Sequence, residues 1–185
     1  MKNHLLIASR NSRMDLDQVY FWTDTIHNWN HLLNDCHKEI IINQLQWLVK
    51  KNLIQVYSFV IMPNHIHIIW KLLSKNGKEM PHASFNKWTS NNFLKSLREK
   101  NPSSLKDYTE ETPERNHRFW QRDPLAVLMD SREKMEQKLN YIHLNPLAKN
   151  WKLVKTPEEY KWSSANFYLT GHDEFEILTH YMDYY

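Results

Sequence analysis

Two extended runs separated by a single Pro-Asn pair constrain the fold more than any other feature. Residues 54–62 read IQVYSFVIM and residues 65–72 read HIHIIWKL, so both are rich in β-branched and aromatic side chains. Such runs favour strands, and Pro63-Asn64 is a typical turn sequence. We therefore predict a β-hairpin with largely buried strands.

The rest of the chain alternates between extended and helical patterns. Strand-like segments are predicted at 18–26 and 119–129, a long polar loop at 101–116, and amphipathic helices at 36–51, 84–99 and 131–145. Ser131 is a suitable N-cap for the last helix, and Pro146 follows its end. The order β-α-β-β-α-β-α predicts an α+β fold, a ferredoxin-like split βαβ sandwich. Its antiparallel sheet carries helices on one face and leaves the other free for a site.

Composition excludes several classes of protein. The length of 185 residues with 41% hydrophobic residues suits one domain over 1–185, with an acidic tail at about 172–185. Two glycines leave no Gly-rich phosphate loop, and Cys36 alone can form neither a disulfide framework nor a cysteine zinc cluster. No apolar run suggests a signal peptide or a membrane span. We therefore expect a cytoplasmic protein without a membrane partner.

The charge is distributed unevenly along the chain. Seven basic and two acidic residues lie between Lys71 and Lys100, whereas Trp162 to Tyr185 holds four acids and no Lys or Arg. A basic segment of this kind suits a polyanion, although a solvated helix face gives the same pattern. The candidate contacts to a nucleic-acid backbone are Lys87, Lys95, Arg98 and Lys100.

The second hairpin strand begins with a His-x-His pair. Residues two apart in a strand point the same way, so His65 and His67 share one face while Ile66 and Ile68 face the core. Two convergent imidazoles are two ligands of a metal site that lacks a third. The alternative is a pair of solvent-facing histidines on a half-exposed strand.

The helix predicted at 131–145 carries a second candidate. Gln137, Tyr141 and Asn145 lie four residues apart, so they share a face beside the core stripe. The Asn145 amide oxygen can serve as the third metal ligand. The alternative is a tyrosine packed at the domain edge and an asparagine that only ends the helix before Pro146.

A tyrosine beside a metal has a chemical use. Its phenol has a pKa of about 10, so it attacks well only when its proton is removed or its target is polarised. Neutral imidazoles and a carbonyl oxygen leave the charge of a metal undiminished. Such an ion polarises a phosphodiester strongly.

Four motifs in order carry a resemblance over roughly 19–171. They are MPNHIHIIW from Met62, FWQRD from Phe119, KLNYIHLNPLAKNWKLV from Lys138 and PEEYKWSSANFYLTG from Pro157. Together they resemble the REP-associated tyrosine transposases of the HUH single-tyrosine superfamily. The resemblance implies a metal-dependent single-strand DNA endonuclease and strand transferase. It would act at hairpin-bearing repeat DNA through a 5′-phosphotyrosine intermediate, in a bacterial cytoplasm.

The resemblance also implies roles for individual residues. His65 and His67 match the metal-binding pair for Mg²⁺ or Mn²⁺, Asn145 occupies the place of the third ligand, and Tyr141 matches the nucleophile, which makes 131–145 the C-terminal catalytic helix. In the FWQRD segment Trp120 can stack on a base or pack in the core, and Arg122 can hold a phosphate. Gln137 is a candidate to position the tyrosine or the ion. Both monomers and homodimers occur among related proteins, and the sequence leaves this open.

The remaining motif residues are expected to be structural. His143 lies about 200° around the helix from Tyr141 and is predicted to be structural or solvent-facing. Tyr160, Trp162 and Ser163 are predicted to pack against the sheet.

Two other functions compete with a tyrosine transposase. One is a non-catalytic, domesticated protein that binds hairpin DNA. The other is a two-histidine metal hydrolase that activates water, but residues 63–73 lack the carboxylates it requires. Covalent attachment of DNA to the protein distinguishes the first function from both.

Overall fold

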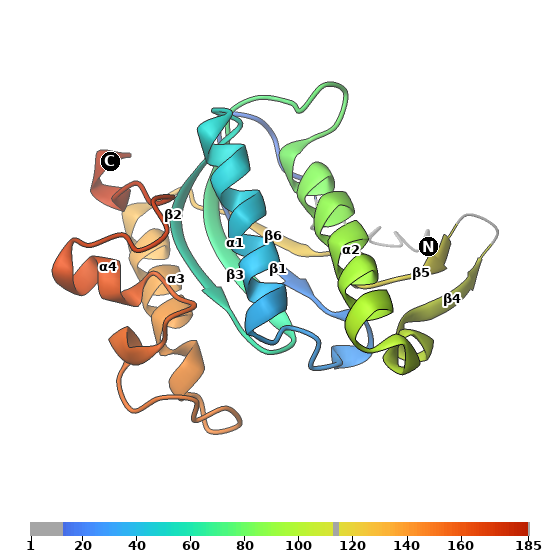
Figure 1. Ribbon diagram of the computed structural model, residues 1–185. Helices are drawn as coiled ribbons and strands as arrows, with labels where there is room; N and C mark the ends of the chain where they lie inside the picture. The colour runs from blue at the N-terminus through green and yellow to red at the C-terminus, as the bar shows by residue number, and fades with distance from the viewer. Residues whose placement is uncertain (1–12, 113–114, 185) are drawn as a thin grey trace, which may run out of the picture.

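A four-stranded antiparallel sheet forms the centre of the molecule. The computed structural model describes residues 13–112 and 115–184, so the first twelve residues of the predicted domain, 113–114 and Tyr185 lie outside the described part. The strands follow the order β2-β3-β1-β6 (Figure 1). They are β1 Val19–Thr25, β2 Ile54–Ile61, β3 His65–Leu72 and β6 Leu125–Leu128.

The sheet has the predicted split βαβ arrangement. Strand β3 lies between β1 and β2 and pairs antiparallel with both, while β6 pairs antiparallel with the other edge of β1. The predicted hairpin joins β2 and β3, and the backbone N–H of Met62 donates to the carbonyl of His65 across its turn at 2.8 Å. The prediction of an α+β sandwich is therefore confirmed.

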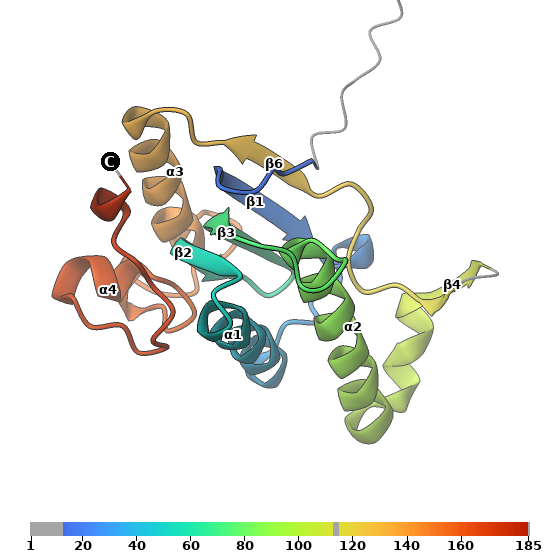
Figure 2. The ribbon, with the colours of Figure 1, turned by 90° about the horizontal axis from the view of Figure 1, so that it is seen from above.

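Two helices cover one face of the sheet. They are α1 Asp35–Lys50 and α2 Pro81–Lys100, and Figure 2 shows them side by side below it. Asn34 caps α1 by accepting from the backbone N–H of His37. The Trp22 and Trp70 rings stack at 4.9 Å between centroids, and Phe85 of α2 packs edge-on against both. This aromatic cluster is the main core of the fold.

The opposite face is only partly open. Helix α3, Arg132–Leu144, begins at the predicted N-cap Ser131 and packs over β2 and β3 (Figure 2). His143 of α3 lies against Ser58 of β2. The prediction that this face is left free is therefore wrong where α3 covers it. Sequence periodicity identified the helix but not the side on which it packs.

The described residues of 101–116 are more ordered than the predicted loop. They form the 3-10 helix η2 Pro102–Tyr108 and the strands β4 Thr109–Thr112 and β5 Arg115–His117, which pair as a second small sheet. Tyr108 is buried and stacks on Phe119 at 5.1 Å. Only 125–128 of the extended segment predicted at 119–129 forms a strand. The polar composition of 101–116 predicts a loop, but the buried Tyr108 packs this segment against Phe119.

The acidic C-terminal segment packs against the domain. After the short elements η3 Asn145–Leu147, η4 Pro157–Glu159 and α4 Ala165–Thr170, the chain runs along β2 to η5 Tyr181–Asp183. The backbone N–H of Thr179 donates to the carbonyl of Val56 at 2.8 Å, and Ile177 is buried. The Asp173 carboxylate accepts from the backbone N–H groups of Phe175, Ile177 and Leu178. One of the four acids therefore shapes a turn.

Among the helices of the described residues, none has the length and apolar character needed to cross a membrane.

Candidate active site

Strand register places the His-x-His pair on the face that α3 partly covers. In the pairing of β1 with β3, His65 lies opposite Thr25 and His67 opposite Thr23. The two imidazole centroids are 4.8 Å apart, and the side chains are only 8% and 5% exposed. The pair is therefore buried, unlike the solvent-facing alternative considered from the sequence.

The inner ring nitrogen of each histidine already has a protein partner. Asn64 Oδ1 lies 2.6 Å from His65 Nδ1, and Thr23 Oγ1 lies 2.7 Å from His67 Nδ1. Because Asn64 Nδ2 donates to the Trp29 carbonyl, the orientation of its amide is fixed and Oδ1 accepts the His65 proton. Partners of this kind set the tautomer of metal-binding histidines. His65 Nδ1 therefore carries the proton and its Nε2 is left to coordinate a ligand, and the Thr23 hydroxyl can support the same tautomer of His67 by accepting from its Nδ1.

Burial keeps both histidines neutral. It lowers the pKa of His65 to about 4 and that of His67 to about 3, and the positive charges of His65 and Lys138 depress the pKa of His67 further. Neutral imidazole is the form that coordinates a metal. The pair is thus ready for coordination at neutral pH.

Asn145 lies next to the pair at the end of α3. The Asn145 side chain raises the pKa of His65, but this effect is smaller than the lowering of the pKa by burial. Asn145 Oδ1 itself has no hydrogen-bond partner. Asn145 Oδ1 and His67 Nε2 are both buried without a hydrogen-bond partner. Two of the three proposed ligands therefore have a buried polar atom that is free to bind an ion.

This donor set fits a divalent metal. Imidazole nitrogens suit transition metals, and an amide oxygen suits Mg²⁺ and Mn²⁺. The described residues contain no group of three or more His, Cys, Asp or Glu side chains placed to hold an ion. Asn145, which is not one of these residue types, is therefore the side chain beside the His-x-His pair that could supply a third protein ligand.

Tyr141 lies directly beside the histidines. Its ring centroid is 5.1 Å from that of His67 and 6.0 Å from that of Phe21, and the side chain is 47% exposed. The structure thus brings together residues from β3 and α3 that are more than seventy positions apart. The tyrosine is open to solvent where the histidines are not.

Lys138 is a site residue that the sequence analysis missed. Its Nζ lies 4.7 Å from the Phe21 ring centroid and 5.5 Å from that of Tyr141. Gln137, the residue predicted to support the tyrosine, is exposed, and Lys138 takes the place over the ring. The signal was available, since Lys138 is three residues before Tyr141 on a helix and such pairs are neighbours.

Trp120 belongs to the core. It is 5% exposed, its Nε1 donates to Thr89 Oγ1 at 2.9 Å, and its ring packs against Phe85 and Phe93. No face of the ring is available to stack on a base, so its assignment as a DNA contact is corrected to core packing. The sequence leaves both roles open, because an aromatic side chain can either pack in the core or stack on a base.

The predicted basic residues lie in a different layer from Tyr141. Lys87, Lys95, Arg98 and Lys100 belong to α2, on the opposite side of the sheet (Figure 2). Lys87 forms an ion pair with Glu79 at 2.7 Å, and Lys100 Nζ lies 3.0 Å from Cys36 Sγ. Arg122 is exposed and paired with Glu110. The structure does not bring these five cations together with the tyrosine.

The remaining motif residues have structural contacts. His143 is buried, and its Nε2 lies 2.9 Å from Ser164 Oγ, in agreement with a structural role. Tyr160 donates to the Ile61 carbonyl and Trp162 donates to Asp35, so both hold the C-terminal segment against β2 and α1 as predicted.

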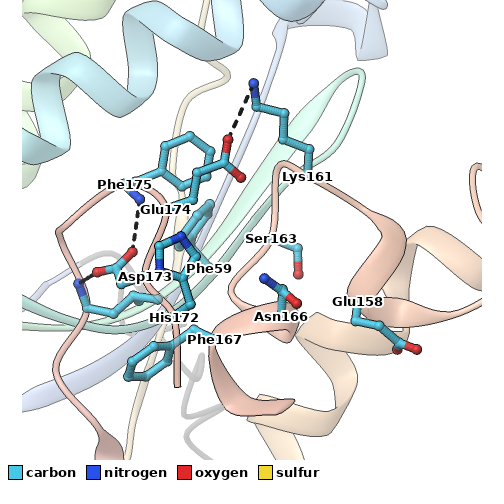
Figure 3. A pocket seen from close by; sticks show the side chains of 11 residues that line it. Phe59, Glu158, Lys161, Ser163, Asn166, Phe167, His172, Asp173, Glu174 and Phe175 are labelled. Carbon is cyan, nitrogen blue, oxygen red and sulfur yellow. Dashed lines mark hydrogen bonds and ion pairs between the residues drawn. The ribbon is translucent and has the colours of Figure 1, made fainter. Parts of the chain in front are cut away.

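Two cavities lie away from the histidines. The first, about 60 Å³, is shown in Figure 3 beside the C-terminal segment, where Lys161 pairs with Glu174 and Asp173 is engaged by backbone N–H groups. Its polar groups therefore serve the fold. The second, about 290 Å³, lies between residues 30–34 and the ends of α2 and η2. Neither includes Tyr141, which stands on an open face.

The molecule is thus a ferredoxin-like sandwich that carries a buried His-x-His pair beside an exposed tyrosine. Its fold is similar to a solved structure of a REP-associated tyrosine transposase bound to a REP hairpin. The two share 17% sequence identity and superpose with a TM-score of 0.57 over 89% of this chain and 88% of the other. At this identity the similarity concerns the fold, and it agrees with the fold that the sequence motifs implied. No family model matches the chain, and no curated protein is similar to it.

Proposed function

We propose that this protein is a metal-dependent single-strand DNA endonuclease and strand transferase that acts at hairpin-bearing repeats. The observation that carries the proposal is the juxtaposition of two neutral, buried imidazoles with the exposed hydroxyl-bearing ring of Tyr141. The unpartnered Nε2 of His67 suits a metal ligand, and the exposed Tyr141 beside it is accessible to a substrate. The similarity of the fold to a hairpin-bound transposase supports DNA as that substrate.

His65, His67 and Asn145 would hold a divalent ion such as Mg²⁺ or Mn²⁺. When bound there, the ion polarises the scissile phosphodiester as a Lewis acid. Asn64 and Thr23 would hold the two imidazoles with Nε2 toward the ion, by accepting from the Nδ1 atoms of His65 and His67. The protein therefore supplies a neutral ligand set, and the positive charge of the ion remains available to the phosphate.

Tyr141 would act as the nucleophile. Its hydroxyl oxygen attacks phosphorus, the bond between phosphorus and the 3′-oxygen breaks, and the phenol proton is balanced by the proton gained on the released 3′-OH. The product is a 5′-phosphotyrosine that keeps the energy of the phosphodiester bond. A later attack by a 3′-OH restores the tyrosine and joins the strand, so neither ATP nor water takes part.

Lys138 would hold the phosphate during this exchange. Its ammonium group lies over the Tyr141 and Phe21 rings, and among the described residues no ion pair engages it. A cation next to developing negative charge lowers the barrier to phosphoryl transfer. Its place beside the nucleophile suits the phosphate that is being attacked.

The decisive experiment is the capture of a covalent DNA adduct. Hairpin oligonucleotides from palindromic repeats that flank the gene are labelled on the 5′ or the 3′ side of the cut and incubated with Mg²⁺ or Mn²⁺. The 3′-side label should migrate with the denatured protein, and the 5′-side product should carry a free 3′-OH. Tyr141→Phe should abolish the adduct while hairpin binding remains, because only the hydroxyl is lost.

Tyr181→Phe is the matched control, since Tyr181 contacts the same helix through Glu136 but away from the histidines. An adduct that survives Tyr141→Phe would move the nucleophile elsewhere. Hairpin binding without an adduct under any metal condition would favour the non-catalytic hairpin-binding alternative. A His65→Ala, His67→Ala double variant that still cleaves would remove the metal from the proposal.

A further inference from the structure

Trp29 is an exposed aromatic residue in a strained turn. Its side chain is 61% exposed, more than any other tryptophan named among the exposed apolar residues. The backbone φ angles of Asn28 and Trp29 are +55° and +58°, a conformation that bulky residues rarely adopt. The turn thus exposes a large apolar ring to water in a backbone conformation that costs free energy. This combination points to a functional role for Trp29 more than to a packing role.

Hydrogen bonds fix this turn in place. The turn is η1, His27–Trp29, and the Trp29 N–H donates to the Ile26 carbonyl at 2.9 Å. The His27 N–H donates to the Phe119 carbonyl at 2.7 Å, and the Trp29 carbonyl accepts from Asn64 Nδ2 at 3.2 Å. A ring carried by a backbone anchored at three points is preorganised for contact with a ligand.

The same Asn64 amide joins the turn to the candidate active site. Its nitrogen holds the Trp29 carbonyl, and its oxygen lies 2.6 Å from His65 Nδ1. The Asn64 amide therefore connects the turn directly to His65, a proposed metal ligand. A second link runs through aromatic rings, since Trp151 lies 5.4 Å from His31 and 5.9 Å from His65.

We infer that Trp29 is a stacking platform for an unpaired base of the DNA strand that enters the active site. The inference rests on the proposed function and adds a base-contacting residue to it. An indole ring offers a flat face to any base, and base stacking on aromatic side chains is a general means of holding single strands. Residues 30 and 31, which follow the platform, line the polar cavity of about 290 Å³. The lining of this cavity includes the polar side chains of Asn30, His31 and Asn34.

Fluorescence quenching of 2-aminopurine tests the inference. The base is placed at one position at a time in the single-stranded flank of the hairpin, and binding is measured in the Tyr141→Phe background without metal, so that no cleavage occurs. Quenching should peak at one position or two adjacent positions. Trp29→Ala should remove the peak and weaken binding about 10-fold to 100-fold. Trp29→Phe, which keeps a ring, should retain most of both.

Trp47→Ala is the matched control, because Trp47 is an exposed tryptophan on α1 in the helix layer. It should change neither the quenching profile nor the affinity. Equal behaviour of the Trp29→Ala and Trp47→Ala variants would overturn the inference, as would the absence of any quenched position. The adduct assay on the protein with Tyr141 intact reports on the proposed function separately. An adduct formed equally well by Trp29→Ala would therefore reject the platform and leave the nuclease standing.

Discussion

The two faces of the central sheet differ sharply although they are built from the same strands. On the helix-covered face, Trp22, Trp70 and Phe85 are fully buried and contact one another. On the other face, His65 and His67 are buried beside Tyr141, which is almost half exposed. Alternation along β3 assigns Ile66 and Trp70 to the first face and the histidines to the second. Alternate residues of β3 therefore serve different ends: one set packs in the core, and the other set belongs to the candidate active site.

This separation explains why a polar pair is tolerated in the sheet. The apolar face stabilises the fold by burying side chains other than the histidines. Burial of the histidines lowers their pKa, so they are buried as neutral groups and not as charges. Changes on the helix face should therefore alter folding, and changes on the other face should alter binding and catalysis.

The largest effect is expected for Trp120→Ala on the helix face. Removing a buried ring that packs against Phe85 and Phe93 should lower the free energy of unfolding by about 3–5 kcal/mol. Urea denaturation measures this loss, with Trp47→Ala as an exposed control expected to stay within about 0.5 kcal/mol. A stable Trp120→Ala protein with weakened DNA binding would restore the base-stacking role that the structure denies it.

A smaller effect with a distinctive pH dependence is expected at Asp24, which lies between β1 and α2. Burial raises its pKa to about 7, partly offset by hydrogen bonds from Asn86 and the Thr25 N–H. Because this pKa is above the ordinary value, the folded state binds the proton more tightly. The resulting stabilisation is complete below about pH 4 and lost as the pH rises through 7.

Asp24→Asn should therefore raise the free energy of unfolding at pH 8 relative to wild type, by at most about 4 kcal/mol. The two proteins should converge toward pH 4. The new amide can also donate to Asn86 Oδ1, a buried atom without a partner. Parallel urea titrations at the two pH values measure the difference, and identical pH dependence in both proteins would show that Asp24 does not titrate in this range.

On the site face, Thr23→Val should act on the metal and leave the fold nearly unchanged. The substitution removes the hydroxyl that holds His67 Nδ1 at 2.7 Å but keeps a side chain of similar shape. Loss of such a partner typically weakens metal binding about 10-fold to 100-fold. Calorimetric titration with Mn²⁺ measures the change, and Thr23→Ser should retain the wild-type affinity. Equal affinity in all three proteins would mean that the hydroxyl does not orient His67.

Much of this fold could be predicted from local patterns. The β2–β3 hairpin, α1 and the Ser131 cap follow from alternation, helical periodicity and capping chemistry over short windows. The shared face of His65 and His67 also follows from the period of a strand. These features depend on neighbours in sequence, where one chain carries enough information.

The errors arise where distant segments meet. The side of the sheet covered by α3, the burial of Trp120 under α2 and the anchoring of η2 by Tyr108 depend on contacts between segments remote in sequence. The α2 cations are predicted as DNA contacts from their charge alone, and in the structure the sheet lies between them and Tyr141. Lys138 differs from these cases, because it is an i, i+3 neighbour of Tyr141 and the predicted site face rests on i, i+4 spacing alone.

The smallest effect is expected in the salt dependence of DNA binding. Its measurement distinguishes which face of the sheet the DNA strand follows. Each phosphate contact contributes somewhat less than one unit to the slope of log affinity against log salt, about 0.7 for single strands. If the strand approaches Tyr141 over the open face, Lys138→Ala should reduce the slope by about this amount, because its ammonium lies over the tyrosine ring. Lys134→Ala, which changes an exposed residue of α3 paired with Asp130, is the matched control and should not change the slope.

The combined Lys87→Ala, Lys95→Ala and Arg98→Ala variant should also keep the wild-type slope, since these side chains lie on the helix layer. A slope that falls only in the triple variant would place the DNA on the helix layer and separate its binding surface from Tyr141.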